Sequence, residues 1–262
     1  MSIREEPWAN GTPCWSDLTT TDQPAAIAFY TRMFGWQVED KGPRMGHYGL
    51  AMIRHRPIAG ITPAPPGPQA PPPVWTTYLS TDDVDKSCSL VGSHGGTVLM
   101  GPMDVGSDGR AAMAVDPTGA IFGLWQPRNH IGAQMVNEPG AMCWNECMTR
   151  DAAAAKDFYH AVFGFRYCDV EIMSGYTMIA RPEGDLGPET AIGGIAQIAP
   201  NQPAPSHWMT YFAVADATKA VAAVAEAGGS VVAGPMSTPY GPIAICRDPQ
   251  GAVFSVIRLP LT

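Results

Sequence analysis

A helical period of apolar side chains follows Asp22. The apolar residues are spaced i, i+3, i+4 and i+7, so they share one face of a helix: Ala26, Phe29, Tyr30 and Met33. Asp22 is a favourable N-cap, and Pro24 lies in the first turn, where proline is tolerated. Gly35 supplies the usual C-terminal stop. The pattern predicts one amphipathic helix that ends at Gly35.

This helix belongs to a longer stretch that occurs twice in the chain. Residues 14–36 read CWSDLTTTDQPAAIAFYTRMFGW, and residues 143–165 read CWNECMTRDAAAAKDFYHAVFGF. Both copies contain a Cys-Trp pair, an acid two residues after the Trp, an Asp, a Phe-Tyr pair and a closing Phe-Gly. Such self-similarity at a fixed spacing predicts a protein built from two related halves.

Runs rich in β-branched and aromatic residues predict strands around each helix. In the first half we expect strands at 12–20, 36–39, 48–53, 58–62, 75–81, 97–99, 110–115 and 120–125. A second helix is capped by Asp83 and ends at Gly95. The proline-rich run Pro63–Pro73 predicts an extended connector. A strand, a helix and three strands therefore form one unit, and each half contains two units.

The second half repeats the second unit as well as the first. WMTYFAVAD from Trp208 matches WTTYLSTDD from Trp75, and the DPQG turn at Asp248 matches the DPTG turn at Asp116. We therefore predict an α+β fold of four βαβββ units, in which curved mixed sheets carry helices outside and a concave face inside. The expected domains are residues 10–127 and 140–260, related by a pseudo-twofold axis and joined by residues 127–140.

Composition narrows the choice of partners and compartment. The 262 residues are 45% hydrophobic and 15% charged, which suits a globular protein. A net charge of −8 argues against nucleic acid or an anionic membrane as the main partner. No apolar run is long enough to span a bilayer, and the first residues have no apolar signal-peptide core. Six cysteines without a CxxC pattern indicate reduced thiols. We expect a cytoplasmic protein that is a monomer with an internal pseudo-dimer, or a weak homodimer.

The repeated motifs resemble those of the vicinal oxygen chelate superfamily, which includes glyoxalases, bleomycin-resistance proteins and extradiol dioxygenases. The residues that carry this resemblance are Asp22…Phe29-Tyr30…Phe34-Gly35, the matching set from Asp151 to Gly164, and the two DPxG turns. The pattern covers nearly the whole chain and is most similar to two-domain members labelled glyoxylase or hydroxylase. The resemblance implies two glyoxalase-like or bleomycin-resistance-like domains, and it implies the fold far more strongly than the reaction.

The resemblance also implies where metal ligands would stand, and the residues found there are poor ligands. The first ligand lies seven residues before the capping Asp, and others lie at the same place in the second units, after the DPxG turn and near the end of the first unit. These positions hold Trp15, Trp144, Thr76, Met209, Gly123, Ser255 and the runs 59–61 and 193–195. Iron, zinc, nickel or manganese sites need imidazole and carboxylate donors. We therefore predict no metal centre of this type and no cofactor.

Strand alternation selects the candidate catalytic residues. If Trp15 faces the cavity, Asp17 shares its face, and Glu146 likewise shares the face of Trp144. A carboxyl on a largely apolar concave face has a raised pKa and suits a general acid or base. The alternative is an acid that is paired with an arginine or solvated at the rim, because unpaired carboxylates are seldom buried. Glu146 and then Asp17 are the catalytic candidates.

The same alternation suggests residues that would bind the substrate. These are the two tryptophans and neighbouring strand residues: Trp15, Trp144, Tyr78, Tyr211, His207 and Met148. Aromatic rings offer an apolar surface with a polar tip, which suits planar ligands. Core packing between the halves is the alternative for the tyrosines, and a structural role is the alternative for His207. Arg110 is a candidate to neutralise an anionic substrate or Asp17.

Two functions fit these features. The first is a metal-independent enzyme of the lyase, isomerase or hydroxylase-like class, which acts on a hydrophobic or aromatic small molecule by acid/base chemistry. The second is a protein that sequesters a drug or metabolite, as bleomycin-resistance proteins do without metal. A metal-dependent glyoxalase with displaced ligands is a third reading. The sequence does not separate the first two, because both need the same aromatic cavity.

Overall fold

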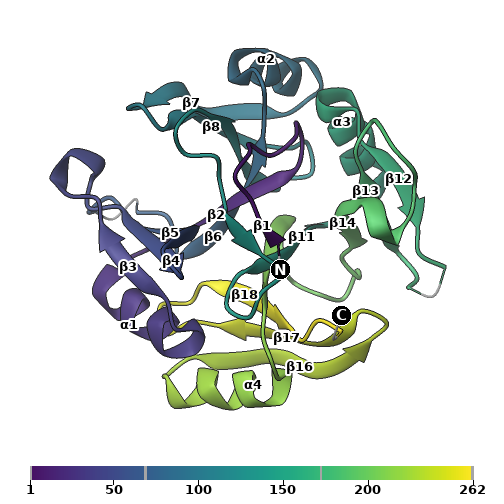
Figure 1. Ribbon diagram of the computed structural model, residues 1–262. Coiled ribbons are helices and arrows are strands. Elements are labelled where there is room, and N and C mark those ends of the chain that lie inside the picture. Colours follow the sequence, from purple (N-terminus) through teal and green to yellow (C-terminus); the bar gives the residue numbers. More distant parts are fainter. Residues whose placement is uncertain (1, 68–69, 172, 261–262) are drawn as a thin grey trace.

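The computed structural model describes residues 2–67, 70–171 and 173–260. Each half of the chain forms one eight-stranded sheet (Figure 1). The first half supplies β2 (Pro13–Thr20), β3 (Gln37–Asp40), β4 (Gly49–Ile53), β5 (Arg56–Pro63), β6 (Val74–Ser80), β7 (Thr97–Val105), β8 (Gly109–Val115) and β9 (Ile121–Pro127). The second half supplies β11 (Met142–Thr149), β12 (Arg166–Asp169), β13 (Tyr176–Ala180), β14 (Ala191–Gln197), β15 (His207–Ala213), β16 (Ser230–Thr238), β17 (Gly241–Arg247) and β18 (Val253–Ile257).

The two sheets have the same topology. Their strand orders are β3-β4-β5-β2-β6-β9-β8-β7 and β12-β13-β14-β11-β15-β18-β17-β16. In each, the first strands of the two units, β2 with β6 and β11 with β15, pair antiparallel at the centre. The predicted α+β fold of four βαβββ units is confirmed.

Four helices lie around the outside of the paired sheets (Figure 1). They are α1 (Gln23–Phe34), α2 (Val84–Ser93), α3 (Ala152–Phe163) and α4 (Ala217–Glu226). The Asp22 carboxylate accepts the backbone N–H of Ala25 at 3.0 Å, and Gly35 ends α1 with a φ of 70°, which favours glycine. The predicted caps are thus confirmed. Among the described residues, no helix combines the length and the apolar character needed to cross a bilayer.

The halves pack reciprocally, because each apolar cluster draws on both of them. One cluster joins α1 and β5 to β18 and α4, and the other joins α2 and β9 to α3 and β14. The Tyr30 hydroxyl donates to Asp248 at 3.1 Å, and the Tyr159 hydroxyl donates to Asp116 at 3.0 Å. The repeated Phe-Tyr pair of one half therefore contacts the DPxG turn of the other.

A buried polar cluster lies where the two sheets meet. The Thr77 hydroxyl donates to Asn145 Oδ1 at 2.8 Å, and the Ser16 and Thr210 hydroxyls lie 3.0 Å apart. Ser16 and Asn145 occupy matching positions on β2 and β11. Because neighbouring strand residues face opposite ways, Asp17 and Glu146 face away from this interface. Each half therefore has its concave face on the outer side of the paired sheets.

Some features were not predicted. A small sheet pairs β1 (Ser2–Ile3) with β10 (Met135–Val136), inside the segment expected to be only a linker. Strand β7 continues to Val105, beyond the expected end at residue 99. The connector Pro63–Pro73 falls partly on residues 68 and 69, outside the described residues. The domain limits 10–127 and 140–260 stay a prediction.

Candidate functional site

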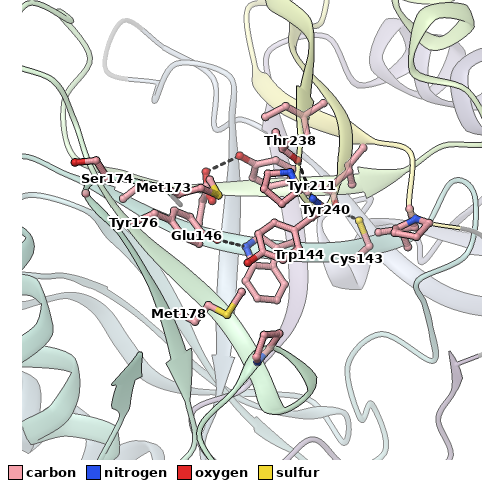
Figure 2. Close-up of a pocket in the computed structure, with 18 of the residues that line it drawn as sticks. Cys143, Trp144, Glu146, Met173, Ser174, Tyr176, Met178, Tyr211, Thr238 and Tyr240 are labelled. Carbon is pink, nitrogen blue, oxygen red and sulfur yellow. Dashed lines mark hydrogen bonds between the residues drawn. The ribbon is translucent and has the colours of Figure 1, made fainter. Parts of the chain in front are cut away.

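Glu146 stands at the floor of the concave face of the second half. It is central in β11, where it pairs with Gly194 of β14 and Met209 of β15, and it is only 7% exposed. The Tyr211 hydroxyl donates to Glu146 Oε1 at 2.5 Å. Beside it, the Trp144 indole N–H donates to the Tyr176 hydroxyl at 2.8 Å, as the dashed lines in Figure 2 show. Two phenols and one indole therefore surround a single carboxyl group.

A cavity of about 570 Å³ opens above this carboxyl. Its walls are mainly apolar and aromatic, and they include Trp144, Met173, Tyr176, Met178, Tyr211, Tyr240, Ile243, Ile257 and Leu259 (Figure 2). A second cavity of about 640 Å³ shares Cys143, Trp144, Glu189 and Pro260 with the first. This volume is that of a small-molecule site, and a ligand in the first cavity has space to continue past Trp144.

Burial raises the pKa of Glu146, while hydrogen bonds from Tyr211 and Tyr176 act in the opposite direction. Burial and the Glu146 charge also raise the pKa of Tyr176 and Tyr211, so both phenols stay protonated and donate. Glu146 therefore keeps its proton to a higher pH than an ordinary glutamate, which suits a group that gains and loses a proton during a reaction.

The first half contains the same arrangement around Asp17. The Tyr48 hydroxyl donates to Asp17 Oδ1 at 2.5 Å, and the Trp15 indole N–H donates to it at 2.7 Å. Tyr78 is a third hydrogen-bond partner. Burial raises the pKa of Asp17 to about 6. The carboxyl with its Trp and two Tyr neighbours is therefore duplicated together with the fold.

Glycines make room for these tyrosines. A Cβ added to Gly60 would lie 1.9 Å from the Tyr48 hydroxyl, and one added to Gly194 would lie 2.2 Å from the Tyr176 hydroxyl. A Cβ added to Gly123 would lie 2.1 Å from the ring of Tyr78. The space next to the carboxyl is thus filled by phenol groups from neighbouring strands.

The two halves differ in what covers the site tryptophan. Over the first half, the segment 128–134 crosses the concave face, and His130 packs against Trp15 with 4.4 Å between ring centroids. Trp15 is therefore only 4% exposed. Trp144 is more exposed and borders both cavities of the second half. The second half has the more open site.

The other predicted binding residues lie in different places. Met148 pairs with His207 at the end of β11 and packs against the small cluster of Met209, Tyr211 and Ile257. His207 Nδ1 lies 2.8 Å from the Pro205 carbonyl oxygen. Neither residue is among those that line the two cavities.

Arg110 does not pair with Asp17, contrary to one of the suggested roles. Its guanidinium contacts the exposed carboxylate of Asp85 and lies 3.8 Å from Asp104. Arg110 starts β8 at the far side of the first sheet, where acids of α2 and β7 are nearer. A charged side chain takes the closest opposite charge, which the strand pattern alone did not reveal.

Sequence reasoning missed Tyr48, Tyr176 and Tyr240. Tyr48 and Tyr176 reach the carboxyls from neighbouring strands, and Tyr240 precedes β17 and lines the cavity. A signal was present for the first two, because they recur 128 residues apart within the repeat. Tyr240 has Asp108 as its counterpart and gave no such signal.

We expect the stability of an Asp17→Asn variant to depend on pH differently from that of the parent protein. The pKa of Asp17 is raised from 3.8 to about 6, so the folded state holds its proton more tightly. This contribution to stability is complete below about pH 4 and is lost as the pH rises through 6. The parent should lose about 2 kcal/mol relative to the variant between about pH 4 and pH 7.5, after allowance for partial exposure. Urea unfolding at both pH values measures this, and an unchanged difference would contradict it.

The architecture and the duplicated site define a class of protein. The family model for the Glyoxalase/Bleomycin resistance protein/Dioxygenase superfamily matches residues 15–124 and again 145–256. The chain belongs to this superfamily as a two-domain member. The relative named "Putative glyoxylase CFP32" from Mycobacterium tuberculosis is 43% identical over 98% of both chains. The anthracycline biosynthesis protein DnrV from Streptomyces peucetius is 36% identical over 96% of this chain and 94% of the relative.

Solved structures show the same fold at low identity. The Mn(II)-bound glyoxalase from Novosphingobium aromaticivorans is 14% identical, with a TM-score of 0.65 over 95% of this chain and 83% of the other. The 2,3-dioxygenase LapB from Pseudomonas sp. KL28 is 12% identical, with a TM-score of 0.66 over 97% of this chain and 96% of the other. At these identities the likeness concerns the fold alone.

The superfamily implies a metal, so its expected ligand positions were compared with the residues present. In the second half these positions hold Trp144, Met209, Ser255 and Gly194, and none offers an imidazole or a carboxylate. In the part of the chain that the structure describes, no three His, Cys, Asp or Glu side chains converge as a metal site would require. Glu146 stands among phenols rather than beside further ligands. The donor set does not fit a transition-metal centre.

Proposed function

We propose that this protein is a metal-independent enzyme that acts on a hydrophobic or aromatic metabolite by acid/base chemistry in the second-half cavity. Glu146 is the observation that carries the proposal. It is a buried carboxyl with a raised pKa, it opens onto an apolar cavity, and its described neighbours include no cation that would neutralise it. Keeping an acid there costs stability, and function is a reason to retain it.

The chain's own residues supply the parts of such a reaction. Ionised Glu146 takes a proton from the substrate, and the resulting acid returns it to another atom or to a leaving group. Tyr211 and Tyr176 donate hydrogen bonds that hold the carboxyl in place, while the apolar walls exclude water. Proton transfer of this kind suits an isomerase or a lyase. A hydroxylase-like reaction would also need dioxygen and a reductant as co-reactants.

A second function is favoured by one feature of the same site. Tyr211 and Tyr176 already supply hydrogen bonds to Glu146, so a bound molecule meets a carboxyl satisfied from within the chain. An apolar cavity of this kind suits a protein that sequesters a drug or metabolite. The two relatives named for anthracycline biosynthesis support a polycyclic aromatic ligand for either function.

A ligand screen followed by a turnover assay tests the proposal. Aromatic metabolites are screened by the shift in melting temperature, since a ligand at 100 times its Kd adds about 2.7 kcal/mol to stability. The ligands found are then tested for conversion by protein treated with EDTA. We expect turnover to persist without metal. Turnover lost with EDTA and restored by one metal ion per chain would refute metal independence, and tight binding without conversion would favour sequestration.

A further inference from the structure

The first half holds an aromatic ring of its own chain against its site tryptophan. The His130 imidazole meets the Trp15 indole edge-on, with 4.4 Å between centroids and 88° between planes. It also packs against Trp125 at 5.4 Å and 67°. Edge-to-face contacts of this kind are the favoured geometry of aromatic pairs. The concave face therefore includes a slot shaped for an aromatic ring.

Backbone contacts fix the ring in this slot. The Trp125 indole N–H donates to the His130 carbonyl at 2.8 Å, and the His130 N–H donates to the Asp108 carbonyl at 3.0 Å. Ala133 N–H donates to the Cys14 carbonyl at 2.7 Å. Burial lowers the pKa of His130 to about 4, so at neutral pH the slot holds an uncharged aromatic ring.

The three residues around this ring have counterparts in the second half that line its cavity. Trp15 corresponds to Trp144, 129 residues later. Trp125 and Asp108 correspond to Ile257 and Tyr240, each 132 residues later, in step with the matching pairs Tyr78–Gly123 and Tyr211–Ser255. Figure 2 shows Trp144 and Tyr240 on neighbouring walls of the cavity. The place that His130 fills in the first half is therefore part of the cavity in the second.

We propose that the second-half cavity takes an uncharged, planar aromatic ring of a small-molecule ligand in the place equivalent to His130, edge-on to the Trp144 indole and between Tyr240 and Ile257. This inference rests on the proposed function and names the ligand class and its position. Ile257 is smaller than Trp125, and Tyr240 adds an aromatic wall, so the slot is wider and more apolar than its counterpart. A fused ring system fits the cavity of about 570 Å³.

A pair of probes with the same carbon skeleton tests the contact with Trp144. 2-Naphthol is planar and aromatic, whereas decahydro-2-naphthol has the same ten carbons and hydroxyl without aromaticity. Binding of each to the full-length protein is measured by calorimetry at neutral pH. We expect 2-naphthol to bind roughly 3- to 10-fold more tightly, the range that an aromatic pair contributes.

Two matched variants assign this preference to one half. Trp144→Leu should remove the preference for 2-naphthol while keeping an apolar wall, and Trp15→Leu, whose indole is covered by His130, should retain it. A crystal structure with 2-naphthol should place the ring beside Trp144. Equal binding of the two probes, no binding, a preference that survives Trp144→Leu, or a ring found elsewhere would each overturn the inference.

The proposed function fails on a different result. It falls if Glu146→Gln keeps full turnover, whatever the probes do. The ring slot falls if the folded protein does not distinguish the two probes, even where Glu146→Gln has lost turnover. The two experiments therefore separate an incorrect ligand position from an incorrect mechanism.

Discussion

Glu146→Gln should lower turnover on the protein's substrate by roughly 100-fold or more, while the fold and ligand binding are kept. The amide has nearly the same shape as the carboxyl, and its oxygen can still accept the Tyr211 hydroxyl that lies 2.5 Å from Glu146 Oε1. It can neither take up nor release a proton at neutral pH. Turnover per folded molecule, together with the melting temperature and ligand affinity, measures the effect.

Asp17→Asn is the matched control, because the same Trp and Tyr arrangement surrounds Asp17 in the first half. It should leave turnover nearly unchanged if the reaction takes place in the more open second half. Full turnover in Glu146→Gln would remove Glu146 from the mechanism and make Asp17 the next candidate. A lower melting temperature with unchanged turnover would indicate a packing role, and a change in affinity alone would indicate sequestration.

Asp116→Ala should lower the free energy of unfolding by about 3 kcal/mol, which corresponds to a fall in Tm of roughly 6–12 °C for a chain of this size. Asp116 is 3% exposed, and its Oδ1 accepts the backbone N–H groups of Thr118 and Ala120. Its Oδ2 accepts the Tyr159 hydroxyl from the other half at 3.0 Å. Alanine leaves all these buried donors without their acceptor. Differential scanning calorimetry measures the loss.

Two further variants show whether the contact between the halves accounts for this loss. Tyr159→Phe removes only the hydroxyl and should cost about 1 kcal/mol. Asp83→Ala removes an exposed N-cap of α2 and should also cost about 1 kcal/mol. If Asp116→Ala costs no more than Asp83→Ala, the DPxG turn is not an important junction between the halves.

The sequence contained most of the information about the fold because the same local signals occur in related places. Asp22 and Asp151 cap their helices, and Gly35 and Gly164 end them with left-handed φ values. These signals act within a few residues, so they can be read without knowing what packs where. The pairing of β1 with β10 was missed, since two-residue strands carry no periodicity.

The site was only partly predictable, because its members come from strands that are distant in sequence. Alternation along β2 and β11 correctly put Asp17 beside Trp15 and Glu146 beside Trp144 on the outer faces. It could not show that Tyr176 reaches Glu146 across β14, since this depends on the register of three strands and on the missing side chain of Gly194. The position of His130 depends likewise on how residues 128–134 cross the sheet.

The reciprocal packing of the halves has a consequence for synthesis of the chain on the ribosome. Phe29 and Tyr30 are made early, yet they are covered by Phe254 of β18, the strand that is made last. The nascent first half therefore exposes an apolar face until nearly all of the second has emerged. Exposed apolar surface of this kind is what chaperones bind during translation. An incomplete chain that lacks β18 keeps this face exposed, so the cell's proteases and chaperones can distinguish it from the finished protein.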